Sequence, residues 1–160
     1  MIIVSDSGPL ADLVQIGIAD SLPILYEQVF VPPTVMRELC HERSPVSGWA
    51  TRPPEWVTIA APTIIPADLL LDEGEREAIA PALERQADIL LMDELKGRAA
   101  AKALGIRVAG TLAVILDGDS HELFDGLDAL VRLESTTFYA SSELLQAVQE
   151  QLMSLRENPD

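Results

Sequence analysis

Residues 2–10 read Ile-Ile-Val-Ser-Asp-Ser-Gly-Pro-Leu, and this stretch decides the fold class. The apolar run at residues 2–4 predicts a short buried strand, and the turn and helix-start residues after it predict a helix that ends near Gly17. Pro9 suits the first turn of that helix, because its missing N–H group would have no helical partner there. The chain therefore opens with a strand that leads into a helix, and Asp6 lies at the carboxyl end of the strand.

The same strand-to-helix pattern recurs along the chain. Buried strands are predicted at residues 29–31, 89–92 and 106–109, and the helices that follow them at 33–43, 94–104 and 111–116. The other elements predicted before residue 117 are a proline-rich loop with at most a helical turn at 44–56, an edge strand at 56–60 and a helix from residue 71 kinked by Pro81. The C-terminal part is predicted to form a helix at 120–133, a last strand at 138–139 and an amphipathic helix over 144–155.

Strands that alternate with helices predict a mainly parallel central sheet covered by helices on both faces. This is the three-layer α/β/α sandwich of the α/β class. A chain of 160 residues is long enough to bury such a sheet but short for two separate cores. We therefore expect a single domain over residues 1–160.

The composition excludes several kinds of site. Cys40 is the only cysteine, so an internal disulfide is excluded, and with two histidines a zinc site would have few ligands. Any bound metal must be held by oxygen. No apolar run reaches the ~18 residues of a membrane span, and the start of the chain lacks the pattern of a signal peptide. We expect a cytoplasmic protein without a membrane partner.

The chain is strongly acidic. Asp and Glu outnumber Lys and Arg by 26 to 11, which gives a formal net charge of −15. This is unusual for a nucleic-acid-binding protein, because Lys and Arg normally neutralise the phosphates. The excess is steepest over residues 117–160, where the ratio is 10 to 2. Such a skew is typical of a solvated face, and the alternative is a docking surface for a basic protein partner.

Two aspartates lie where a parallel sheet binds ligands. Ligands of open α/β sheets bind outside the carboxyl ends of the strands, and Asp6 and Asp93 each follow a predicted strand. Either one alone is explained as well by structure, because Asp is a preferred helix N-cap and turn residue. The occurrence of two favours a functional interpretation.

Two glutamates complete the candidate set. Positions 75, 78, 79, 82 and 83 form one helical stripe that reads Glu, Ala, Ile, Ala, Leu. Glu75 is therefore expected to point from the start of a sheet-facing stripe toward the strand ends, whereas the glutamates beside it complement the helix dipole. Glu38 only borders the apolar stripe of its own helix, so geometry says less about it.

With these residues in place, the chain resembles the PIN-domain nucleases nearly end to end, in particular the VapC-like toxins and a PIN-like subgroup of similar length. The first two acids of the family match Asp6 in Ile-Val-Ser-Asp-Ser-Gly-Pro-Leu and Glu38 in Val-Met-Arg-Glu-Leu. The other two match Glu75 in Leu-Asp-Glu-Gly-Glu-Arg-Glu-Ala-Ile-Ala and Asp93 in Ile-Leu-Leu-Met-Asp-Glu-Leu-Lys-Gly-Arg. Many family members instead carry Asp at the third position and Thr-x-Asp after the fourth strand, and the subgroup shares the forms seen here.

The four acids suit a metal site. Carboxylates that converge in one cleft repel each other unless a hard cation neutralises them, and oxygen ligands suit Mg²⁺ or Mn²⁺. One or two such ions would activate water against a phosphodiester, with no protein nucleophile. We therefore predict that Asp6, Glu38, Glu75 and Asp93 are both the metal ligands and the catalytic residues.

The resemblance also implies a substrate and partners. Similar proteins cut RNA, and a single-stranded or looped RNA could enter such a cleft with its strand splayed. The implied function is a metal-dependent endoribonuclease that forms the toxin half of a toxin–antitoxin pair. A basic antitoxin protein is then the expected partner, and a homodimer the expected assembly.

Basic residues are scarce, yet four of the eleven fall within residues 96–107, directly after the second strand-end aspartate. Lys96 and Arg98 are predicted to hold substrate phosphate beside the metal. Thr111 and Arg37 are further candidates on position alone. Lys102 and Arg107, the other two basic residues of residues 96–107, are explained at least as well by a solvated helix face.

Two rival functions stay open at this point. One is a phosphotransfer or hydrolase domain of another doubly wound type, in which a strand-end aspartate is the nucleophile or phosphoacceptor. Asp6-Ser7-Gly8 lacks the second aspartate of the haloacid-dehalogenase pattern, and the paired acids of a receiver domain are missing from the first strand. The other rival is a catalytically weak or inactive PIN-like module that binds nucleic acid or regulates.

Overall fold

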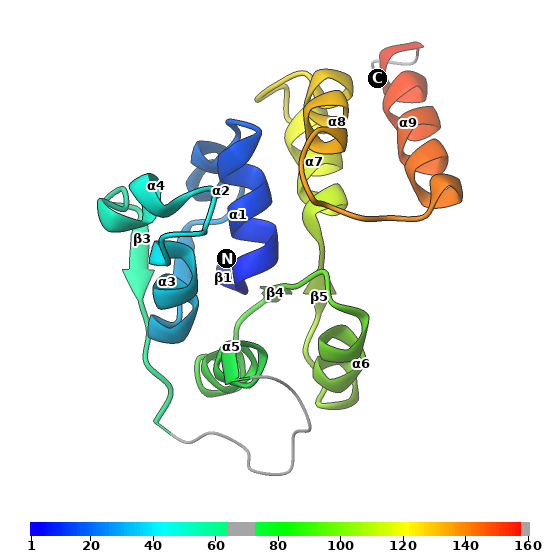
Figure 1. Cartoon of the computed structure of the whole chain (residues 1–160). Coiled ribbons are helices and arrows are strands. Elements are labelled where there is room, and N and C mark those ends of the chain that lie inside the picture. Colours follow the sequence, from blue (N-terminus) through cyan, green and yellow to red (C-terminus); the bar gives the residue numbers. More distant parts are fainter. Residues whose placement is uncertain (64–72, 158–160) are drawn as a thin grey trace.

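The computed structural model describes residues 1–63 and 73–157, and it gives side chains for these except at residues 73–75. The strands are β1 (Ile2–Ser5), β2 (Gln28–Val31), β3 (Val57–Ile59), β4 (Ile89–Leu91) and β5 (Val108–Ala109). The helices are α1 (Ser7–Gln15), the 3₁₀ helix η1 (Ala19–Ser21), α2 (Leu22–Leu25), α3 (Pro33–Cys40), α4 (Ser47–Thr51), α5 (Glu73–Glu84), α6 (Leu95–Ala103), α7 (Thr111–Ser120), α8 (Gly126–Glu134) and α9 (Ser142–Glu157) (Figure 1).

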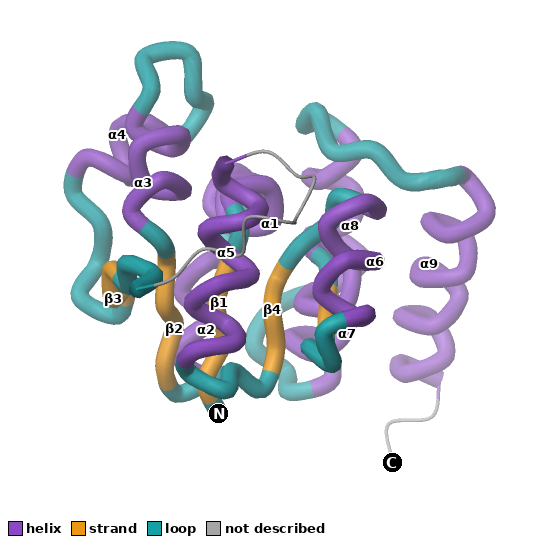
Figure 2. The backbone as a smooth tube through the Cα atoms, turned by 90° about the horizontal axis from the view of Figure 1, so that it is seen from below, coloured by secondary structure: helices purple, strands orange, loops and turns teal. Residues whose placement is uncertain are grey.

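The described strands form one parallel sheet in the order β3-β2-β1-β4-β5. Strand β1 lies at the centre, where Val4 pairs with Phe30 of β2 on one side and with Leu90 of β4 on the other. The chain builds outward from β1 through β2 to β3 and then crosses to the other side for β4 and β5, as Figure 2 shows for the first four strands. The order of the strands therefore reverses between β1 and β4.

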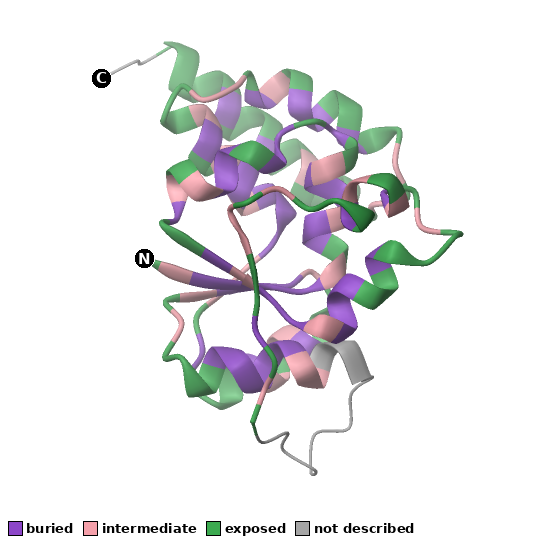
Figure 3. Ribbon diagram, turned by 90° about the vertical axis from the view of Figure 1, so that its left-hand side faces the viewer, coloured by how far each residue is buried: buried purple, intermediate pink, exposed green. Residues whose placement is uncertain are grey.

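Helices cover both faces of the sheet, which confirms the predicted α/β/α sandwich. Successive strand residues point to opposite faces, so Ile3 and Leu91 join one apolar cluster with α1, α3, α7, α8 and α9, whereas Val4 and Leu90 join another with α5 and α6. Figure 3 shows the sheet between its two helical layers, with buried residues along the strands and on the helix sides that face them. The carboxyl ends of β1 and β4 therefore lie beside each other between the two layers.

Several predicted boundaries need correction. The strand predicted at residues 138–139 was wrong, because both residues lie in the connection between α8 and α9. The helix predicted at 120–133 begins only at Gly126, since the Asp125 carboxylate caps it by accepting a 3.2 Å hydrogen bond from Asp128 N. The helix predicted at 33–43 ends at Cys40, and the start of the helix predicted from residue 71 lies outside the described residues.

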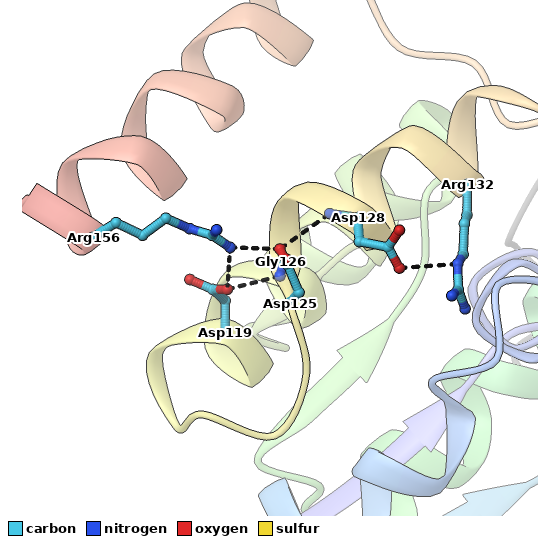
Figure 4. Close-up of polar contacts among 6 residues, drawn as sticks. All are labelled: Asp119, Asp125, Gly126, Asp128, Arg132 and Arg156. Atoms are coloured by element: carbon cyan, nitrogen blue, oxygen red, sulfur yellow. Dashed lines mark hydrogen bonds and ion pairs between the residues drawn. The ribbon is translucent and has the colours of Figure 1, made fainter.

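The C-terminal helix α9 is tied to the preceding helices by a polar cluster (Figure 4). The Arg156 guanidinium contacts the carboxylates of Asp119 at 3.4 Å and Asp125 at 2.5 Å. Asp119 also accepts a 2.7 Å hydrogen bond from Gly126 N. The hydrogen bond from Arg156 holds the pKa of the Asp125 carboxyl below its usual value.

No helix in the described part of the chain has both the length and the apolar character of a membrane span.

Candidate functional site

Asp6 and Asp93 lie together where the strand order reverses. Asp6 follows β1 directly, and its backbone N–H donates a 2.9 Å hydrogen bond to the carbonyl of Leu91 at the end of β4. Met92 continues the pairing on its other side through a 2.9 Å hydrogen bond to the carbonyl of Ala109, and Asp93 is the next residue. The two aspartates therefore border the crevice where parallel α/β sheets bind ligands.

A pocket of about 220 Å³ opens at this crevice, and we name it the acidic pocket. The residues that line it are Asp6, Ser7, Gly8, Pro9, Glu38, Asp93 and Glu94. Glu38 comes from α3 and is exposed, whereas Asp6 is only 7% exposed. Four acidic residues from three separate parts of the chain thus meet at one space, and among the described lining residues none is basic.

The Asp93 carboxylate is fixed by the first residue of α7. Its Oδ1 accepts a 2.9 Å hydrogen bond from Thr111 N, and its Oδ2 accepts a 2.6 Å hydrogen bond from Thr111 Oγ1. Gly110 is the N-cap of α7 and has no side chain for capping. The Asp93 carboxylate, which follows β4, instead accepts the hydrogen bond from the first N–H group of the helix. Each oxygen retains a second lone-pair direction for a cation. Thr111 is completely buried, so it positions Asp93 and does not present a surface to substrate.

Gly110 provides the space that Asp93 occupies. A Cβ atom at Gly110 would collide with Asp93 Oδ1 and would lie 3.1 Å from Arg98 Nη1. The Arg98 guanidinium donates a 2.8 Å hydrogen bond to the carbonyl of Met92. Arg98 therefore supports the end of the β4 segment and lies beside Asp93, although it does not line the acidic pocket.

A fifth carboxyl group lies behind this site. Asp12 of α1 is 8% exposed, and its pKa is raised to about 7, first by burial and second by the negative charge of Asp93. The negative charge of Asp93 thus affects the pKa of a buried carboxyl group beside the acidic pocket. A cation in the acidic pocket would relieve the repulsion between these carboxylates.

The remaining predicted residues are placed less directly. Glu75 lies in the first turn of α5, which packs against α3, β1 and β4, but its side chain lies outside the described residues. Lys96 is exposed in the first turn of α6 and does not line the acidic pocket. The prediction that Lys96 and Arg98 hold phosphate stays a prediction.

Sequence reasoning missed two acidic residues of this region. Glu94 lines the pocket directly after Asp93, and the signal for it was the pair of adjacent acids at a strand end. Asp12 falls in a stripe with Pro9, Leu13 and Ile16, at helical spacings of three and four, and all four are buried. An acid within such an apolar stripe was the same signal that singled out Glu75.

The donor set of the acidic pocket fits a hard divalent cation. Its polar side chains are carboxylates and the Ser7 hydroxyl, all oxygen donors of the kind that Mg²⁺ and Mn²⁺ prefer. Among the side chains that the structure describes, no three acidic, histidine or cysteine groups lie close enough together to hold one ion. The described ligands fit such a cation by the chemistry of their donor atoms, and a bound cation would offset the repulsion between them.

Fold and pocket together define a class of protein, the three-layer α/β/α domains with an acidic site at the reversal point of a parallel sheet. A family model described as a PIN domain matches residues 2–154. The chain therefore belongs to the PIN-domain family, which confirms the resemblance to PIN domains noted in the sequence. PIN domains are generally nucleases and typically use divalent metal ions. No curated protein matches the chain in sequence.

Proposed function

We propose that this chain is a Mg²⁺- or Mn²⁺-dependent endoribonuclease that cleaves single-stranded or looped RNA. One observation carries the proposal: Asp6, Glu38 and Asp93 come from separate elements of a PIN fold and line one pocket where the strand order reverses. These are three of the four acids that the family resemblance selects. A surplus of carboxylates without a basic residue in the described lining is suited to a cation and unsuited to an anion alone.

Each acid has a distinct part in the proposed site. Asp6 is buried at the end of β1 and would hold the cation at a fixed depth, while Asp93 is oriented by its two hydrogen bonds from Thr111. Glu38 is exposed on α3 and can adjust to both cation and substrate. Glu75 remains the proposed fourth ligand. The chemistry supplied on cation binding is activation of a water molecule and neutralisation of charge on the phosphodiester.

We further propose that the protein is the toxin half of a toxin–antitoxin pair, acting in the cytoplasm as a homodimer with a basic protein partner. The acidic C-terminal segment supports the partner, because Asp117, Glu134, Glu143 and Glu150 are all exposed on α7, α8 and α9. A surface of this charge steers a basic partner toward it at low salt.

The proposed activity can be tested with a panel of end-labelled single-stranded and stem-loop RNAs. We expect cleavage in millimolar Mg²⁺ or Mn²⁺, none in EDTA, and recovery when the cation is restored. Cleavage that continues in EDTA would contradict the metal-dependent mechanism. If no RNA is cut and neither cation raises the melting temperature, the chain is a non-catalytic PIN-like module.

Gly110→Ala tests how strongly the site depends on the position of Asp93. The new Cβ would displace the Asp93 carboxylate from the position in which Thr111 holds it. Loss of the orientation of a metal ligand typically lowers activity by about 10- to 100-fold, and we expect kcat/KM for RNA to fall by that factor. The matched control is Gly48→Ala, because a Cβ there meets no atom within 4 Å. Equal activity of both variants would contradict the role of Asp93.

A further inference from the structure

A second pocket adjoins the acidic pocket, and we name it the basic pocket. It has a volume of about 480 Å³, and the residues that line it are Thr34, Arg37, Glu38, His41, Arg43 and Ser44. Glu38 lines both pockets, so the two sites are contiguous across this one side chain. The basic pocket therefore lies directly beside the proposed reaction site.

Helical spacing brings the basic pocket together. Residues 34 and 41 each lie three or four positions from both residue 37 and residue 38, so the four share one side of α3 and of its C-cap. The turn after the helix contributes the other two lining residues, Arg43 and Ser44. Ser44 N donates a 2.8 Å hydrogen bond to the carbonyl of His41, and Arg43 N donates a 3.1 Å hydrogen bond to His41 Nδ1. These bonds hold the turn against the end of the helix.

Three of the six side chains that line the basic pocket carry nitrogen donors, and the other three carry hydroxyl or carboxylate oxygens. The Arg37 guanidinium donates a 2.9 Å hydrogen bond to Thr34 Oγ1, and its fork of five N–H groups can hold this oxygen and an anion together. Because His41 Nδ1 accepts a hydrogen bond from Arg43 N, the neutral ring carries its hydrogen on Nε2 and can donate from there. Arg37, His41 and Arg43 are all exposed to solvent.

The charge of the whole chain makes this grouping informative. A protein with a net charge of −15 and an acidic reaction site repels a polyanion unless cationic groups lie along its path. Two of the eleven Lys and Arg residues lie in the basic pocket, contiguous with the acidic one. The sequence-based candidates Lys96 and Arg98 line neither pocket.

We infer that the basic pocket is a phosphate subsite, which holds the backbone phosphate of a nucleotide next to the one whose phosphodiester occupies the acidic pocket. The inference rests on the proposed nuclease function. Arg37 and Arg43 bind the phosphate oxygens, His41 donates to them from Nε2, and Glu38 separates this phosphate from the cation site. The subsite recognises the charge of a phosphodiester and carries no base specificity.

The test measures binding of a fluorescein-labelled oligouridylate as salt increases, in Mg²⁺ and in the Asp6→Asn background so that the RNA stays intact. Each phosphate contact with a single strand contributes about 0.7 to the slope of log K against log salt. Arg37→Gln with Arg43→Gln should lower the magnitude of that slope by about 1.4. Between about 50 and about 200 mM salt, the double variant should therefore lose about 7-fold less affinity than the protein that keeps both arginines. Replacing both arginines by lysine should restore most of the slope.

The matched control is Lys102→Gln with Arg107→Gln, which removes the same charge. Lys102 lies in the last turn of α6 and Arg107 just before β5, both exposed and at the amino ends of the strands. We expect this control to lower the slope by less than half as much. Equal slopes for the two double variants would overturn the subsite, as would an absence of binding at low salt.

Cleavage by the protein with Asp6 intact distinguishes a failure of the proposed nuclease from a failure of the phosphate subsite. If the chain cuts RNA but the slope is unchanged in the Arg37 and Arg43 variant, the subsite is wrong and the nuclease stands. If the chain cuts no RNA but the slope falls by the expected amount, the nuclease is wrong and the subsite stands. In a chain that does cut, the arginine pair should raise KM for a long RNA about 10-fold at unchanged kcat, because a remote phosphate is bound equally in ground and transition states.

Discussion

Asp6→Asn is expected to reduce RNA cleavage by about 100- to 1,000-fold, the largest effect on activity of any substitution considered for this site. A metal ion stabilises transition-state charge by several kcal/mol, and about 1.4 kcal/mol corresponds to each factor of ten in rate. Asp6 contributes to this because it is 7% exposed and borders the acidic pocket from the end of the central strand. An amide of the same shape keeps the packing but removes the negative charge.

The effect on activity can be separated from an effect on folding. Melting temperatures of Asp6→Asn and of the wild type should agree within a few degrees in EDTA, and the stabilisation of the wild type by Mn²⁺ should be much smaller in the variant. Glu134→Gln is a suitable control, because it removes one carboxylate from an exposed position at the end of α8. Wild-type RNA cleavage by Asp6→Asn would contradict the assignment of Asp6 to the site.

The parallel sheet was predictable from the sequence for a simple physical reason. A strand that is buried on both faces must be apolar throughout, so runs such as residues 2–4 and 89–92 stand out between turn residues. The strand predicted at residues 138–139 had the same apolar character but was only two residues long. There, Phe138 N donates a hydrogen bond to Thr136 Oγ1 and the ring packs against the larger apolar cluster, which explains the apolar residue without a strand.

The positions of the acids were also predictable, whereas their surroundings were not. Strand ends selected Asp6 and Asp93, whereas Glu38 was selected by the family resemblance, and the structure brings all three to one pocket. The support of Asp93 by Thr111 joins residues 18 apart, and no local pattern encodes such a bond. The same holds for the basic pocket, since Arg43 joins the Arg37 face only because α3 ends at Cys40 and the chain turns back.

Asp12→Asn is expected to have the largest effect on stability, and the effect depends on pH. The pKa of the Asp12 carboxyl is raised from 3.8 to about 7 by burial and by the charge of Asp93. Between about pH 4 and pH 7 the folded chain therefore retains a proton that the unfolded chain has lost. The folded state binds more protons in this window, so the free energy of unfolding falls as pH rises, and the loss is complete above about pH 7.

The size of this loss follows from the shift in pKa. Each unit corresponds to about 1.4 kcal/mol, so the titration of Asp12 alone costs up to about 4 kcal/mol between pH 4 and pH 8. An asparagine has no charge in either state, and Asp12→Asn should remove this part of the pH dependence. We expect the variant to unfold with nearly the same free energy as the wild type near pH 4 and to be more stable by a few kcal/mol near pH 8.

Urea unfolding in EDTA at several pH values measures this difference, provided that the m-values of the two proteins agree. Subtracting one curve from the other cancels the contributions of the other acidic residues, and Glu134→Gln controls for the simple loss of one negative charge. A constant difference across the pH range would contradict the raised pKa. Addition of Mn²⁺ should flatten the wild-type curve, because a cation beside Asp93 offsets the second cause of the shift. The buried carboxyl of Asp12 would then report occupancy of the acidic pocket through stability, independently of any RNA.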